Sequence, residues 1–185
     1  MGKIPPQAKR VFRGVIYDVF QWPQTMFDGS EATFEMLKRP DNLSVIPVYE
    51  GKIVVAHEQQ PHFRPWVGLL GGRREGSEDP LLGAQRELRE ETGLVSDDWV
   101  ELAVFDPVPS VDFKIRVFVA RGCHQVGEPH LDPGEKIRLE SVDFERFLEI
   151  VGSREFLGPE IAMHIMRMQL YDPAALAEFR KKLFQ

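Results

Sequence analysis

Hydrophobic and polar positions alternate in several stretches of the chain, and this pattern predicts β-strands. VFRGVIYDVF, from Val11 to Phe20, is rich in β-branched and aromatic residues, and Asp28-Gly29 offers a tight turn before EATFEMLKR. This region predicts a first hairpin. LSVIPVY and KIVVAHE, joined by Glu50-Gly51, predict a second, more deeply buried hairpin. Further strands are expected in WVELAVF, FKIRVFVA and KIRLESV.

The spacing of apolar positions becomes helical after a proline-containing loop from Gln59 to Pro65 and a short apolar run, WVGLL. Asp79 can cap a helix, Pro80 suits its first position, and Gly93 ends the apolar stripe that follows. FERFLEIV, PEIAMHIMRMQL and DPAALAEFRKKLF predict helices near the C-terminus. A mixed sheet with helices on its faces is therefore expected.

Composition narrows the class of protein. With 185 residues, of which 43% are hydrophobic, the chain suits one compact domain. A net charge of -6 and a pI near 5.4 argue against a nucleic-acid partner. The single cysteine, Cys123, cannot form an internal disulfide, so the cytoplasm is the expected location. No apolar run approaches the length of a membrane span, and MGKIPP has no hydrophobic signal core, so no membrane partner is expected.

Acidic residues crowd into RELREETGL, from Arg86 to Leu94, where Glu87, Glu90 and Glu91 lie within five positions. Like charges at helical i,i+4 spacing cost about 0.2 to 0.5 kcal/mol per pair. Helical projection places these carboxylates at the border of the apolar stripe, where a hard cation such as Mg²⁺ could bind oxygen ligands. The other interpretation of the same pattern is a solvated acidic face.

The residues around this cluster favour the metal site. GRREGSEDPLLGAQRELREETGL, from Gly72 to Leu94, resembles the signature of the Nudix hydrolases, G-x5-E-x7-REU-x-EE-x-GU with U a bulky aliphatic, at every defined position. The resemblance implies an α/β fold, a Nudix-type α/β/α sandwich with a mixed β-sheet, an N-terminal β extension and C-terminal helices. It also implies an enzyme that hydrolyses a nucleoside diphosphate linked to another group, with Mg²⁺ or Mn²⁺ as cofactor.

The resemblance also implies roles for individual residues. Glu87 and Glu91 would be the main metal ligands, with Glu90 assisting and the carbonyl of Gly71 as a further ligand. Arg86 would hold the loop and the helix together with Glu78, and an ordinary ion pair from Arg86 to Glu90 is compatible with that role. Gly72 and Gly93 would serve backbone conformations that a side chain obstructs.

A general base must also take a proton from the attacking water. In the branch of the family that cleaves ADP-sugars, this base often comes from a glutamate late in the chain. Here GEPHLDPGEKIRL offers Glu128, Asp132 and Glu135, and Glu135 is the first choice, although solvated loop acids are the competing interpretation. The candidate catalytic residues are Glu135, Glu90 and Arg86.

Residues 1–40 resemble the N-terminal β extension of the ADP-ribose and ADP-sugar pyrophosphatases, which implies a homodimer, with residues 41–185 as the Nudix domain. The expected substrate is therefore ADP-ribose or another ADP-sugar, cleaved to a nucleoside monophosphate and a sugar phosphate. The chain has GLLGG where that subgroup usually has E-L-P-A-G, so a nucleoside triphosphate or dinucleotide pyrophosphatase stays as an alternative. A non-catalytic, nucleotide-sensing module is a third interpretation, disfavoured because every glutamate of the signature is present.

Four residues outside the signature are the candidates for substrate contacts. Arg64 and Arg73 are suited to phosphates. Trp22 and Phe113 are suited to stacking on a base, although an aromatic residue is more often part of a core.

Overall fold

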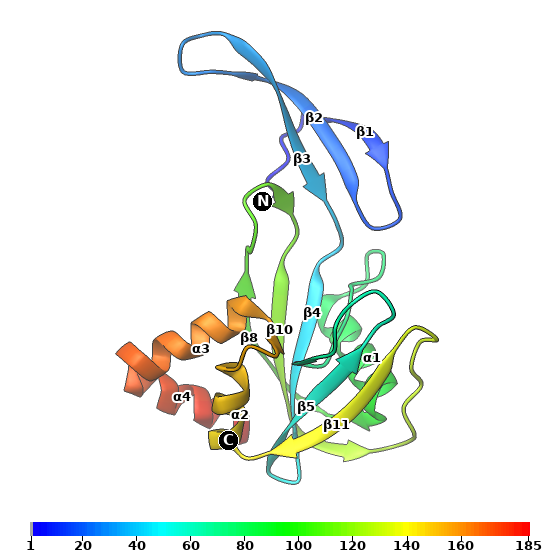
Figure 1. Cartoon of the computed structure of the whole chain (residues 1–185), viewed down its shortest axis with the longest axis vertical. Coiled ribbons are helices and arrows are strands. Elements are labelled where there is room, and N and C mark those ends of the chain that lie inside the picture. The colour runs from blue at the N-terminus through cyan, green and yellow to red at the C-terminus, as the bar shows by residue number, and fades with distance from the viewer. Residues whose placement is uncertain (1) are drawn as a thin grey trace.

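The computed structural model describes residues 2–185, and its strands form two sheets (Figure 1). The first sheet contains β1 (Lys9–Arg13), β2 (Asp18–Thr25), β3 (Glu31–Lys38) and the short β9 (Val111–Asp112), in the order β1-β2-β3-β9. In Figure 1 the strands β1 to β3 project away from the body that carries the helices. The N-terminal extension therefore presents much of its surface away from the main core.

The predicted strand from Val11 to Phe20 is wrong in its bounds, because the chain turns within it. The N–H of Gly14 donates to the carbonyl of Tyr17 at 2.9 Å, and this turn separates β1 from β2. A Cβ at position 14 would lie 2.6 Å from the same carbonyl oxygen, so the turn requires glycine. The predicted turn at Asp28-Gly29 is confirmed, since β2 and β3 pair antiparallel on either side of it.

The second sheet is mixed and forms the body of the molecule. Its strands are β4 (Asn42–Tyr49), β5 (Lys52–Gln59), β6 (Trp66–Gly68), β7 (Leu94–Val95), β8 (Asp98–Phe105), β10 (Ile115–Gln125), β11 (Lys136–Val142) and β12 (Phe156–Leu157). β4 pairs parallel with β10 and antiparallel with β5. The predicted hairpin between β4 and β5 is confirmed, and both Glu50 and Gly51 have the positive φ that a tight hairpin turn needs.

Helices cover both faces of this sheet. α1 (Pro80–Thr92) packs on one face, and α2 (Phe144–Val151), α3 (Pro159–Tyr171) and α4 (Pro173–Phe184) pack on the other. Alternation along β4 supplies both cores: Leu43 and Val45 join the core under α1, while Ile46 and Val48 join the core under the other helices. The predicted α/β/α sandwich is confirmed.

Most predicted elements match the structure closely. KIRLESV and FERFLEIV coincide with β11 and α2, and the helix expected after Asp79 is α1. β10 is longer than FKIRVFVA, and the short strands β7, β9 and β12 were not predicted. Within residues 2–185, none of the helices combines the length and the apolar character that crossing a bilayer requires.

Candidate active site

α1 is held at both ends by the residues that the sequence indicated. The Asp79 carboxylate accepts a hydrogen bond from the N–H of Leu81 at 2.9 Å and caps the first turn. Gly93 ends the helix with φ 70°, and the Thr92 hydroxyl links the carbonyl of Leu88 to the N–H of Leu94. These contacts fix the rotation of the helix about its axis, and therefore the direction of its glutamates.

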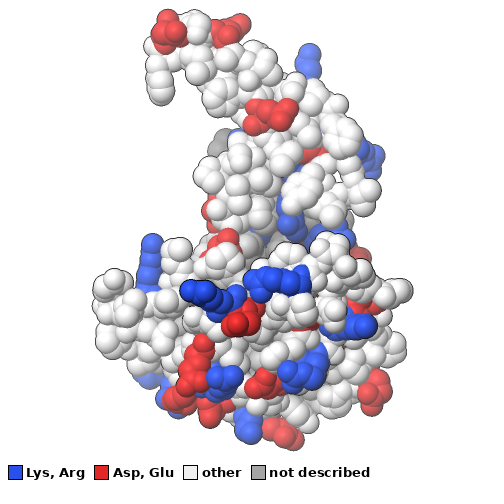
Figure 2. Space-filling view, viewed as in Figure 1, with Lys and Arg blue, Asp and Glu red and all other residues white. Residues whose placement is uncertain are grey.

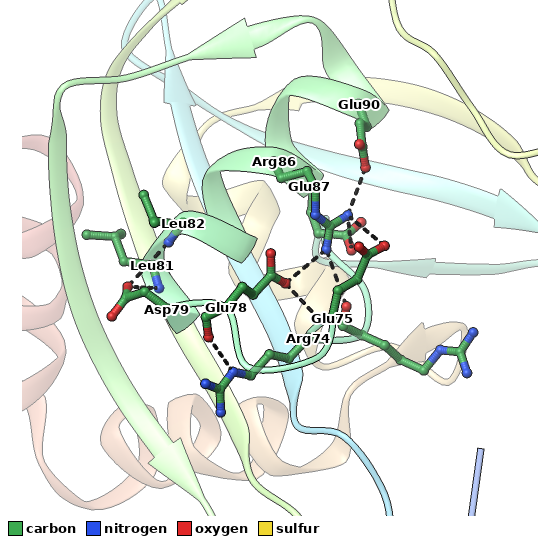
Figure 3. Close-up of polar contacts among 10 residues, drawn as sticks. Arg74, Glu75, Glu78, Asp79, Leu81, Leu82, Arg86, Glu87 and Glu90 are labelled. Carbon is green, nitrogen blue, oxygen red and sulfur yellow. Dashed lines mark hydrogen bonds and ion pairs between the residues drawn. The ribbon is translucent and has the colours of Figure 1, made fainter. Parts of the chain in front are cut away.

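Arg86 lies at the centre of an acidic group on α1 and on the loop before it (Figure 3). Its guanidinium lies 2.9 Å from Glu90, 3.0 Å from Glu87 and 3.2 Å from Glu78. Partial burial opposes the charge, but these partners raise the pKa of Arg86 above its usual range. Burial likewise opposes ionisation of Glu78, yet the N–H of Glu75 and the Arg86 guanidinium lower its pKa. The predicted contacts of Arg86 with Glu78 and Glu90 are therefore present.

Two glycines allow the preceding loop to approach β4 and α1. Gly71 has φ 126°, and a Cβ there would lie 2.1 Å from the carbonyl oxygen of Leu43. A Cβ on Gly72 would lie 2.7 Å from the Glu87 carboxylate. The N–H of Gly71 donates to Glu91 at 2.7 Å. Because no side chain intervenes, the loop backbone lies directly against both carboxylates.

Several carboxylates gather beside α1 without a basic partner. Glu91 is 6% exposed. Burial, together with the like charges of Glu58, Glu87 and Glu135, raises its pKa to about 9, and only the hydrogen bond from the Gly71 N–H lowers it. Burial, followed by the charge of Glu135, raises the pKa of Glu58 to about 7. Among residues 2–185, Glu58, Glu91 and Glu135 form no ion pair.

This donor set suits a divalent cation. Carboxylate and backbone carbonyl oxygens are hard ligands of the kind that Mg²⁺ and Mn²⁺ prefer. Buried acids that repel one another lack a counter-charge, which a cation would supply. In the described part of the chain, no three His, Cys, Asp or Glu side chains are already close enough to hold a metal together. Cation binding would therefore require these carboxylates to draw closer.

The loop that follows β10 brings a further acid to the cluster. The N–H of His130 donates to the carbonyl of Glu90 at 2.7 Å, and the N–H of Val126 donates to the carbonyl of Gly93 at 2.9 Å. These bonds tie the loop to the end of α1. Burial and the neighbouring charge of Asp132 raise the pKa of Glu135, despite a hydrogen bond from the Asp132 backbone. Glu135 and Asp132 line the cavity beside α1, whereas Glu128 does not.

The cavity beside α1 has a volume of about 1030 Å³. It is lined by all four predicted metal ligands, Gly71, Glu87, Glu90 and Glu91. It is also lined by Arg73, Arg86 and Glu135. Three predicted substrate contacts do not line it within this chain. Trp22 is buried against Phe34 in the first sheet, and Arg64 stacks near the Phe63 ring. Phe113 lies under the guanidinium of Arg39. Substrate contacts by Trp22, Arg64 and Phe113 therefore remain predictions.

The cavity residues that were missed from the sequence include Glu58 and Arg39. Glu58 follows Val54 and Ala56 at alternating positions of β5, so it shares their face, which packs against α1. This alternation was a usable signal. Arg39 lies in the segment between β3 and β4, and its side chain also lines the cavity. Nothing in the local sequence distinguishes Arg39 from the other arginines of the extension.

A second cavity, of about 560 Å³, lies between β5, β11 and α2. His57 and Glu140 line it and form a half-buried pair 2.5 Å apart. None of the glutamates of α1 lines this cavity, although Glu58 lines both, so the glutamates of α1 belong to the larger one.

Comparisons with known proteins agree with this geometry. The NUDIX domain family matches residues 38–157. The chain is 30% identical over 166 residues to an ADP-ribose pyrophosphatase of Bacillus subtilis (strain 168), covering 88% of this chain and 90% of the relative. It is 24% identical over 170 residues to a methanol dehydrogenase activator of Bacillus methanolicus, covering 90% and 92%. The crystal structure of an ADP compounds hydrolase superposes with a TM-score of 0.72 at 18% identity, covering 91% of this chain and 94% of that one.

Proposed function

The chain belongs to the NUDIX family of hydrolases, and we propose that it hydrolyses the pyrophosphate bond of ADP-ribose or another ADP-sugar, giving AMP and a sugar phosphate. The observation that carries this proposal is the group of carboxylates beside α1 that lack an ion-pair partner within residues 2–185, Glu58, Glu91 and Glu135, at the wall of a cavity large enough for a nucleotide. A relative named for ADP-ribose hydrolysis, similar along most of both chains, supports the choice of substrate.

Members of this family use divalent metal ions, and we propose Mg²⁺ or Mn²⁺ for this chain. Glu87 and Glu91 would hold the ion, with Glu90 assisting and the carbonyl of Gly71 as a further ligand. A bound divalent cation would neutralise charge on the two phosphoryl groups of the substrate.

The remaining steps of the proposed mechanism use residues of the chain itself. The N–H of Gly71 fixes the orientation of the Glu91 carboxylate. Glu135 accepts the proton of the attacking water, and its raised pKa brings it closer to neutral pH, where a general base works best. Arg73, at the cavity wall, binds a phosphate of the substrate.

Product analysis tests the proposed activity directly. The protein is incubated with Mg²⁺ or Mn²⁺ and, separately, with ADP-ribose, ADP-glucose, a dinucleotide and a nucleoside triphosphate, and the products are separated chromatographically. We expect AMP from the ADP-sugars at the highest kcat/KM. Preferred cleavage of the triphosphate or the dinucleotide would favour the alternative substrate class. Binding without cleavage of any compound would instead favour a nucleotide sensor.

The proposed base has its own test. Glu135→Gln keeps the shape of the side chain but removes its basicity, so kcat should fall about a hundredfold while KM changes little. Glu128→Gln is the matched control, because Glu128 belongs to the same loop but does not line the cavity. If Glu135→Gln retains the wild-type kcat, the role passes to Asp132.

We also propose that residues 1–40 mediate a cytoplasmic homodimer. Exposed apolar side chains gather on this extension: Val11, Phe12, Val15, Ile16, Tyr17, Met26, Phe27 and Phe34. In Figure 2, acidic groups lie at the tip and in the middle of the projecting arm and basic groups at its edge, with uncharged surface between them. Such a surface suits burial against a second copy. Phe12→Glu should therefore halve the mass measured by light scattering, and Leu170→Glu on α3 should not.

A further inference from the structure

Arg39 lines the cavity that contains the glutamates of α1, yet it has no acidic partner. Its guanidinium donates to the carbonyl oxygen of Pro40 and to the side-chain oxygen of Asn42, both of which are neutral. No carboxylate of residues 2–185 forms an ion pair with it. A half-buried guanidinium with neutral neighbours retains its full positive charge toward the cavity.

Two aromatic rings hold this guanidinium in place. Its central carbon lies 4.8 Å from the centre of the Phe113 ring and 5.8 Å from that of Tyr17. Both distances fall within the range of cation–π attraction. Tyr17 ends the turn between β1 and β2, and its neighbour Ile16 lines the cavity itself. The N-terminal extension therefore reaches the cavity through Ile16, the neighbour of the residue that stacks on Arg39.

Backbone pairing places Arg39 close to the proposed metal loop. Asn42, which accepts from Arg39, forms an isolated β-bridge with Arg73. The next residue, Leu43, donates its N–H to the carbonyl of Gly72 at 2.8 Å, and Gly72 lies against Glu87. Arg39 is thus connected to the carboxylates of α1 through only the first residues of β4 and Gly72. A substrate with two phosphates is attracted by Arg39 but repelled by the nearby carboxylates. It can contact both groups only if a bound cation offsets the charge of the carboxylates.

We propose that Arg39 is a substrate-binding residue that contacts a phosphate of the substrate, and that Phe113 and Tyr17 position it for this contact. The proposal deepens the proposed function and rests on it, because the ligand class is a nucleoside diphosphate joined to another group. Arginine suits the contact, since its planar group can donate two hydrogen bonds to one phosphate while its face stacks on a ring. Phe113, predicted above to stack on a base, would then act through Arg39 instead.

Affinity for a ligand that cannot be cleaved tests the contact apart from the chemistry. The probe is the α,β-methylene analogue of ADP-ribose, titrated by calorimetry in Mg²⁺. Arg39→Ala should weaken binding about 10- to 100-fold, the range expected for loss of a charged hydrogen bond. Arg39→Lys should recover part of the affinity, because it restores the charge but not the flat group. Arg13→Ala is the matched control, since Arg13 is an exposed arginine of β1 that does not line the cavity.

The positioning role of Phe113 needs a double-mutant cycle. Phe113→Leu removes the ring face and should weaken binding of the same analogue about two- to fivefold. In the Arg39→Ala background the same change should have no further effect, because there is no guanidinium left to position. A merely structural role of Phe113 would instead give an equal loss in both backgrounds, which would overturn this part of the proposal.

Steady-state kinetics with ADP-ribose complete the test. Arg39→Ala should raise KM by the same factor as it weakens analogue binding, with a smaller change in kcat. The proposal would be overturned if Arg39→Ala bound the analogue with an affinity within twofold of wild type. If the alanine variant has a lowered melting temperature, the measurement is repeated with Arg39→Gln. If the wild-type protein cleaves no substrate, the proposed function fails, but analogue binding still decides the role of Arg39.

Discussion

The two sides of α1 carry the same type of residue in opposite electrostatic settings. On one side, Arg86 lies within 3.2 Å of carboxylate oxygens of Glu78, Glu87 and Glu90, so these three acids share one positive partner. On the other side, Glu91 is buried against Gly71 with only a backbone N–H as partner. Glu87 belongs to both groups, since it contacts Arg86 and adds to the repulsion on Glu91.

We expect this difference to separate acids that stabilise the fold from acids that bind the proposed metal ion. A paired carboxylate lowers the free energy of the folded state, and removing its partner leaves a charge uncompensated. A buried carboxylate among like charges raises the free energy of the folded state, so it persists only where function requires it. The two sides should therefore respond in opposite ways to substitution.

The largest effect should come from Glu91→Gln. The amide keeps the size of the side chain and can still accept the Gly71 N–H, but it removes a proposed metal ligand. We expect kcat/KM for the preferred substrate to fall about a thousandfold, because metal stabilisation of the transition state contributes several kcal/mol. The melting temperature in EDTA should not fall, since the amide removes the cost of burying a carboxyl group that is ionised in the unfolded chain. Near-normal turnover would refute the role of Glu91 as a ligand.

Arg86→Met should show the opposite balance. Methionine preserves much of the packing volume but leaves Glu78, Glu87 and Glu90 without their shared cation. We expect a loss of about 2 kcal/mol in unfolding free energy, measured by urea denaturation, and a drop in kcat/KM of only about tenfold through Glu87. If the stability of this variant matched that of wild type, the ion pairs of Arg86 would not stabilise the fold.

Much of the fold was predictable because its elements follow local rules. The Asp79 cap, the Pro80 start and the Gly93 end defined α1, and alternation defined β4 and β11. Local rules failed where pairing across the chain decided the outcome. β9 and β12 have only two residues each and exist through their pairing with β3 and β6.

Part of the candidate site was also predictable from the sequence. Glu87, Glu90 and Glu91 share a short motif on one helix, so their spacing alone indicated a common surface. Glu58 and Arg39 reach the same cavity from strand and linker positions that are distant in sequence. Alternation along β5 indicated the face of the sheet on which Glu58 lies, but the position of Arg39 depends on how the chain packs beside α1, which no local pattern specifies. The burial that separates Glu91 from Glu78 likewise appears only in the folded chain.

The pH dependence of stability should sharpen the contrast. The folded-state pKa of Glu91 is about 9, above its ordinary value of 4.5, so the unfolded chain releases this proton first as pH rises. Metal-free protein should therefore lose stability between about pH 5 and pH 9, by at most about 1.4 kcal/mol per pH unit for this group. Added Mg²⁺ should restore stability, increasingly at higher pH, because it binds the ionised form.

Thermal melts at several pH values, in EDTA and in Mg²⁺, check this expectation. Glu91→Gln should flatten the metal-free pH dependence and reduce the gain from Mg²⁺. The contrary outcome is a metal-free melting temperature that rises over the same pH range. That result would refute the raised pKa of Glu91, because paired carboxylates such as Glu78, whose pKa is lowered, are ionised in both the folded and the unfolded chain over this range.

The smallest effect should come from Glu75→Gln on the outer edge of the Arg86 group. The Glu75 side chain is 73% exposed, and its carboxylate lies 3.9 Å from the guanidinium, so solvent screens the pair. We expect a change within about 0.5 kcal/mol in unfolding free energy and an unchanged kcat. Glu78→Gln, measured in parallel, should cost more, because the Glu78 side chain is only 22% exposed and its carboxylate lies 3.2 Å from the guanidinium. Equal losses in the two variants would mean that net charge near Arg86, and not the geometry of each contact, stabilises this side of α1.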